Sequence, residues 1–92
     1  MNPTLTLRAK PADEVLFQAL GDEAVLLSLA SERYFSLDPV GTRIWTLLVE
    51  DPSLRQAFAT LCAEYDVEPD RLETDLLELI GQLAEAGLVQ VS

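Results

Sequence analysis

The apolar residues of this chain change their spacing once, at Asp38 and Pro39, and that change decides the fold class. Before it, apolar residues come in short β-rich runs, and after it they recur every three or four positions. Aspartate suits a helix N-cap, and proline suits the first helical position. Strands followed by helices predict an α+β fold, winged helix-turn-helix-like, with an N-terminal three-stranded antiparallel sheet followed by three helices.

Three runs are predicted as the strands of that sheet: residues 15–17, 24–30 and 33–37. The last two are separated by so few residues that they indicate a hairpin. Residues 4–7 alternate and predict a short edge strand, and residues 88–91 predict a short closing strand. Within 33–37, alternation places Phe35 and Leu37 on the core face and leaves Tyr34 half exposed.

The helices after Pro39 are bounded by recognisable start and stop residues. Ser53 and Gln56 have the spacing of a capping box and predict the start of the second helix. The third helix is predicted from Pro69 to a glycine C-cap at Gly87. A tight turn at residues 66–68 is expected to join the last two helices.

The predicted third helix has a wider apolar surface than one core contact requires. Its central stripe is Leu72, Leu76, Leu79 and Leu83; Leu77, Ile80 and Ala84 extend the apolar surface to one side, and Ala86 to the other. This arc covers about half of the circumference, whereas packing on one core needs only about 100°. Two interpretations remain open: part of the arc forms the wall of an exposed groove, or a small domain covers the helix on two sides.

The charge of the chain opposes nucleic-acid binding. Sixteen acidic residues stand against six basic ones, a net charge of −10. The predicted third helix, which would enter a DNA groove, carries five acids against Arg71 alone. Such a surface repels phosphates and anionic lipid and favours basic or neutral partners. A winged-helix transcription regulator is therefore only the alternative interpretation, and no nucleic acid or membrane is expected as a partner.

Residues that commonly carry catalysis are few. The chain has no histidine, no phosphate-binding glycine loop and no pair of spaced cysteines, so we expect no metal, no cofactor and no enzyme activity. The single Cys62 lies at helical spacing among apolar residues and is predicted to be a small buried residue; a cysteine nucleophile is the third alternative. One cysteine fits a reducing cytoplasm, and residues 1–92 are predicted to form one domain.

The central segment resembles the PqqD-like family. The resemblance is carried by residues 25–29, by residues 34–45 (YFSLDPVGTRIW) and by the later Leu61, 65–67, Leu72, 75–76, Leu83 and 87–88. It covers about residues 15–91. The 34–45 motif is most similar to the stand-alone leader-binding proteins of lasso-peptide biosynthesis. Ser36 stands where a glycine is common in that family.

The resemblance implies a recognition element that binds the leader of a ribosomally made precursor peptide and presents it to a leader peptidase. In the cofactor branch of the family, the partner is a radical SAM enzyme. The leader would add as an antiparallel strand to the third strand, beside a groove completed by the third helix. The residues then expected to bind the leader are Arg33, Tyr34, Phe35, Ser36, Leu37, Leu72, Asp75, Leu76, Leu79, Ile80 and Leu83. Asp75 is expected to hold a hydroxyl or basic group of the leader.

Overall fold

The computed structural model describes residues 4–92, and it has the expected α+β architecture. Four strands precede the helices, and a short strand follows them. In chain order the elements are β1 (Ala9–Pro11), β2 (Val15–Leu20), β3 (Glu23–Ser28), β4 (Arg33–Leu37), α1 (Pro39–Glu50), α2 (Leu54–Glu64), α3 (Pro69–Glu85) and β5 (Val89–Val91).

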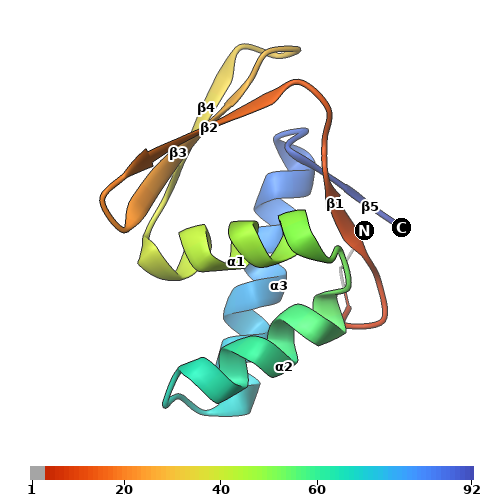
Figure 1. Ribbon diagram of the computed structural model, residues 1–92. Helices are drawn as coiled ribbons and strands as arrows, with labels where there is room; N and C mark the ends of the chain where they lie inside the picture. Colours follow the sequence, from red (N-terminus) through yellow and green to blue (C-terminus); the bar gives the residue numbers. More distant parts are fainter. Residues whose placement is uncertain (1–3) are drawn as a thin grey trace.

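The three-stranded antiparallel sheet has the order β2-β3-β4, so β4 lies at one edge and β2 at the other. The β3–β4 hairpin pairs Ser28 with Arg33 and Ala24 with Leu37. Figure 1 shows this sheet projecting beyond the helices, with α1 crossing below it and in front of α3. The predicted three-stranded antiparallel sheet is therefore confirmed, although β2 continues to Leu20, beyond the predicted 15–17, and β3 ends at Ser28, before the predicted end at residue 30.

The expected edge strand at residues 4–7 is wrong. This segment forms a turn, in which the Leu7 amide donates to the Thr4 carbonyl at 3.0 Å. Leu5 and Leu7 still pack against the core, so their alternation reflects burial without a strand. The strand of this region is β1, which pairs with the correctly predicted closing strand β5 in a separate small sheet. Strand β1 contains a lysine and a proline, which are depleted in strands, so its sequence did not predict a strand.

The junction between β4 and α1 is tight. The Asp38 carboxylate caps α1 by accepting from the Gly41 amide at 2.7 Å. A Cβ on Gly41 would lie 3.1 Å from that carboxylate and 3.3 Å from a methyl of Leu37. Because glycine has no Cβ, the end of β4 can approach the first turn of α1 closely. The helix start predicted from Asp38 and Pro39 is confirmed.

The other predicted helix boundaries also agree with the structure. The Ser53 hydroxyl caps α2 by accepting from the Gln56 amide at 3.2 Å. Helix α3 begins at Pro69 and ends at Glu85, and Gly87 follows with a φ of 77°, in the left-handed region that glycine accommodates.

One core joins the inner face of the sheet to all three helices. Its fully buried large side chains come from β3, from each helix and from the segment before β5: Leu26, Leu48, Leu54, Leu61, Leu76, Ile80, Leu83 and Leu88. Cys62 is half-buried and packs against this core. Since Leu76, Ile80 and Leu83 are all buried, most of the wide apolar arc of α3 faces the core.

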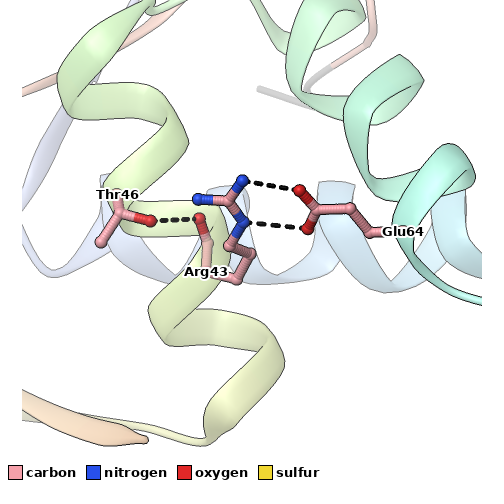
Figure 2. Close-up of polar contacts among 3 residues, drawn as sticks. All are labelled: Arg43, Thr46 and Glu64. Carbon is pink, nitrogen blue, oxygen red and sulfur yellow. Dashed lines mark hydrogen bonds and ion pairs between the residues drawn. The ribbon is translucent and has the colours of Figure 1, made fainter.

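A bidentate ion pair ties α1 to α2. The Arg43 guanidinium donates to both oxygens of Glu64, at 2.9 and 2.6 Å, while the Thr46 hydroxyl donates to the Arg43 carbonyl (Figure 2). The hydrogen bond from Arg43 lowers the pKa of the Glu64 carboxyl, with its charge adding to the effect. Both side chains are more than one third exposed, so water and salt screen the pair.

We expect the Arg43–Glu64 pair to give the protein a small pH-dependent stability. Because the pKa of Glu64 is lowered on folding, its contribution is present above the unfolded pKa and is lost as pH falls through the folded pKa. Glu64→Gln should therefore lower the melting temperature slightly at pH 7 and leave it unchanged near pH 2. Thermal unfolding across pH 2–7 measures this, with Glu78→Gln as a control for the loss of an exposed acid. Equal shifts for the two variants at pH 7 would contradict a specific role of the ion pair.

Candidate functional site

The most distinctive surface feature is the free edge of β4. This strand pairs with β3 on one side only, so the backbone groups on its other side are unpaired within the sheet. Such an edge accepts a further strand through main-chain hydrogen bonds. Its two faces differ, because Leu37 is buried and Phe35 half-buried, whereas Tyr34 is 74% exposed. The predicted core face of the strand is confirmed, and Tyr34 is more exposed than expected.

A groove of about 270 Å³ opens beside the C-terminal half of β4. Its lining comes from β4, the first turn of α1 and α3: Phe35, Ser36, Leu37, Asp38, Gly41, Leu79 and Gln82. Polar groups dominate its accessible surface, while Phe35 and Leu79 add apolar contact. A strand added to β4 would therefore carry some of its side chains into a partly polar groove.

A second, smaller pocket of about 100 Å³ lies between α1, the α2–α3 turn and the first half of α3. It is mainly apolar and is lined by Val40, Ile44, Tyr65, Val67, Arg71, Leu72, Asp75 and Leu76. Asp75 and Leu79 are four residues apart on α3 and therefore neighbours on one helix face, so this pocket lies one turn along α3 from the groove. Val40 of this pocket is next in sequence to Gly41 of the groove, so both hollows lie beside the first turn of α1.

The eleven residues expected to form the site fall into four groups in the structure. Phe35, Ser36, Leu37 and Leu79 line the groove, and Leu72, Asp75 and Leu76 line the second pocket. Arg33 and Tyr34 lie on β4 and are exposed, but line neither. Ile80 and Leu83 are fully buried in the core and have no surface to offer a peptide, so we leave them out of the site. Leu76 is equally buried and contributes only the floor of its pocket.

The sequence-based prediction missed eight lining residues: Asp38, Val40, Gly41, Ile44, Tyr65, Val67, Arg71 and Gln82. The spacing of Asp75, Leu79 and Gln82 at i, i+4 and i+7 was a usable signal for Gln82, because such residues share one helix face. Val67 lies in the turn between α2 and α3, and its side chain is 48% exposed. Hydrophobic periodicity does not identify a lining residue in a turn.

The outer face of the sheet carries a second exposed apolar surface. Leu16 pairs with Leu27, and Leu27 pairs with Tyr34, so the three side chains form one row across β2, β3 and β4. Leu16 is 52% exposed and Leu20, further along β2, is 59% exposed. We call Leu16, Leu20, Leu27 and Tyr34 the outer patch. Phe35 and Leu37 point to the opposite face of the sheet, so the outer patch and the groove are accessible independently.

Within residues 4–92, no group of three or more histidine, cysteine or acidic side chains lies close enough to hold a metal ion. Among the helices that the structure describes, none combines the length and apolar character needed to cross a membrane.

Two solved structures share this fold over nearly their whole length. TbiB1 in complex with the TbiA(beta) leader peptide is 40% identical, with a TM-score of 0.83, and the match covers 88% of this chain and 94% of that chain. A lasso peptide synthetase B1 complexed with the leader peptide is 25% identical, with a TM-score of 0.79, and the match covers 90% of this chain and 98% of that chain. No curated protein matches the sequence.

The family model of coenzyme PQQ synthesis protein D (PqqD) matches residues 23–89. The matched segment begins at β3 and runs to the start of β5, so it includes β4, all three helices and every residue that lines the groove and the second pocket. It is shorter than the resemblance over residues 15–91, because it leaves out β2. The resemblance seen in the sequence is confirmed, and the chain belongs to the PqqD family.

Proposed function

We propose that this protein binds the leader segment of a ribosomally synthesised precursor peptide and presents it to the leader peptidase of lasso-peptide biosynthesis. The observation that carries the proposal is the free edge of β4 beside the groove to α3. The two solved neighbours, both complexes with leader peptides, support the nature of the ligand. The protein itself would act without catalysis, as a binding partner.

The proposed binding mode follows from the edge and the two hollows beside it. The leader adds to β4 as an antiparallel strand, the more common and slightly stronger pairing. Its side chains on the inner face enter the groove against Phe35 and Leu79. Residues upstream of the added strand pass the end of β4 at Leu37 and reach the small apolar pocket, where Asp75 can accept a hydrogen bond. Backbone pairing supplies affinity, and the two hollows supply selectivity.

Titration with a leader peptide tests the proposal. Using the TbiA(beta) leader as ligand, we expect saturable binding with a dissociation constant in the micromolar range or below, measured by isothermal titration calorimetry. A scrambled peptide of the same composition is the control. Absence of heat at several hundred micromolar peptide, with both this leader and one from the chain's own biosynthetic cluster, would reject leader binding.

Delivery to the radical SAM enzyme of a cofactor pathway is the second candidate, since the matching family model describes a coenzyme PQQ synthesis protein. We favour the lasso branch because one solved neighbour is a lasso peptide synthetase B1, and the match covers 98% of that chain. The two candidates share the binding mode and differ in the enzyme that receives the peptide. A transcription regulator is disfavoured, because α3 is acidic on its exposed side: Asp70, Asp75, Glu78 and Glu85 are all exposed.

The outer patch supports the presentation step. Exposed apolar patches on small proteins commonly mark protein–protein contacts, and this one stays accessible when a leader occupies the groove. We expect Leu16→Glu to abolish stimulation of leader cleavage by the cluster's peptidase while leaving leader affinity within about twofold. Cleavage rates and calorimetry on the same variant measure the two effects. Unchanged stimulation would move the enzyme contact away from the outer patch.

A further inference from the structure

The two ends of β4 carry different charge. At the C-terminal end, Asp38 follows the strand directly and is exposed. Asp75 is also exposed and lies one helical turn before Leu79, which lines the groove. Glu23 adds a third acid, since it comes immediately before Ala24, the register partner of Leu37. This end is therefore negative.

Arg71 compensates the charge of these acids only weakly. Arg71 lies 4.0 Å from Asp75, and the two side chains are 81% and 61% exposed. An ion pair of that length and exposure is weak, so Asp75 keeps most of its ability to attract a cation. Asp38 uses one carboxylate oxygen, Oδ1, to cap α1, and its negative charge is retained.

At the N-terminal end of β4, Arg33 is exposed and takes part in no ion pair within residues 4–92. Glu32 precedes it in the hairpin turn, with a φ of 58°. Glu14 is a second acid at this end, since its carbonyl accepts a hydrogen bond from the Leu29 amide of the hairpin turn. It precedes β2, which lies two strands from the free edge, whereas Arg33 lies on the edge strand itself. A bound leader therefore meets the charge of Arg33 first, and this end is less negative than the other. Arg33 and Asp38 are five positions apart, about 16 Å along an extended strand. That exceeds the Debye length of about 8–10 Å at physiological salt, so the two ends act on different residues of a bound peptide.

We propose that this edge selects leaders by how charge is distributed along them, and that it favours basic leader residues near Asp38 and Asp75. The proposal rests on leader binding at β4. In an antiparallel pairing, the leader residues next to Asp38 come first in the leader, and those next to Arg33 come about five positions later. The preferred leader is therefore basic on the N-terminal side of its strand segment, and neutral or acidic on the C-terminal side.

A charge scan of the TbiA(beta) leader tests this preference. Each leader residue is replaced in turn by lysine and by glutamate, and the ratio of the two dissociation constants is measured for this protein at low salt. The ratio cancels the loss of the original side chain. We expect lysine to bind about two- to tenfold more tightly than glutamate at the upstream positions. The preference should disappear or reverse about five positions later, and should shrink at 0.5 M salt.

Protein variants assign the effect to the named residues. Asp38→Asn, which keeps the helix cap, combined with Asp75→Asn should abolish the upstream preference for lysine. Arg33→Glu should create a preference for lysine at the downstream positions only. Glu50→Gln, which removes an exposed acid at the far end of α1, is the matched control and should leave the profile unchanged.

Three outcomes would overturn the inference. A lysine preference that is uniform along the leader would show that only the net charge of −10 attracts the peptide. A preference for lysine at the downstream end would show that the leader lies in the opposite direction. Failure of every peptide to bind, the unmodified leader included, would reject the proposed function and this inference with it.

Discussion

Leu79→Asp is expected to weaken leader binding by about 100-fold or more and to leave the protein folded. Leu79 lines the groove beside β4 and is only half-buried, so a carboxylate there remains partly hydrated in the free protein. When the leader covers it, that charge loses hydration beside Phe35 and the Asp38 carboxylate, and no basic side chain lines the groove to compensate it, which costs several kcal/mol. A loss of about 2.8 kcal/mol already corresponds to 100-fold in the dissociation constant. Calorimetric titration with the TbiA(beta) leader measures the effect.

Leu77→Asp is the matched control for this prediction. Leu77 is the same residue type on the same helix and is likewise half-buried, but it lines neither the groove nor the second pocket. Its replacement should cost similar stability and leave leader affinity nearly unchanged. Equal losses of binding in the two folded variants would show that α3 acts on the leader only through overall stability, and would contradict the groove.

Leu76→Ala is expected to destabilise the protein by about 2–5 kcal/mol, the range found for leucines truncated in well-packed cores. The Leu76 side chain is fully buried, in contact with the core that joins the sheet to the helices. A domain of this size has a total stability of roughly 5–14 kcal/mol, so the variant loses a large part of it. Urea denaturation followed by circular dichroism gives the change in midpoint at constant slope.

Leu79→Ala provides the comparison for Leu76→Ala. Because Leu79 is only half-buried, the same truncation should cost about 1–2 kcal/mol. The sequence places the two leucines on one stripe of the predicted helix, and both were expected to contact the leader. If the two alanine variants were destabilised equally, the division of α3 into a core side and a groove side would be wrong.

Much of the fold could be predicted because local signals agree with the tertiary structure. Asp38, Ser53 and Gly87 mark helix ends through backbone chemistry that acts within a few residues, and each lies where it was expected. Alternation in β4 gave its inner face correctly. The small β1–β5 sheet joins the two ends of the described chain, and β1 carries no strand pattern of its own, so the sequence held little sign of that pairing.

The site could be predicted only in part, for a geometric reason. The wide apolar arc of α3 shows that the helix is covered on more than one side. Hydrophobic periodicity does not show whether the core or a bound peptide covers each part of the arc. The structure places Leu76, Ile80 and Leu83 against the core and leaves Leu79 beside β4. Which leucines of α3 face the core depends on the rotation of the helix relative to the sheet, and tertiary packing sets that rotation. Gly41 similarly needed the structure, because its role depends on the distance between β4 and α1.

The central claim, that a leader adds as a strand to β4, is tested most directly by amide hydrogen exchange. In the free protein, the outward-facing amides of residues 33–37 have no partner in the sheet and should exchange quickly. Saturation with the TbiA(beta) leader should slow their exchange by at least about tenfold, while the amides at the free edge of β2 keep their rates. Protection confined to β2, or none in either edge strand despite saturating binding, would contradict strand addition to β4.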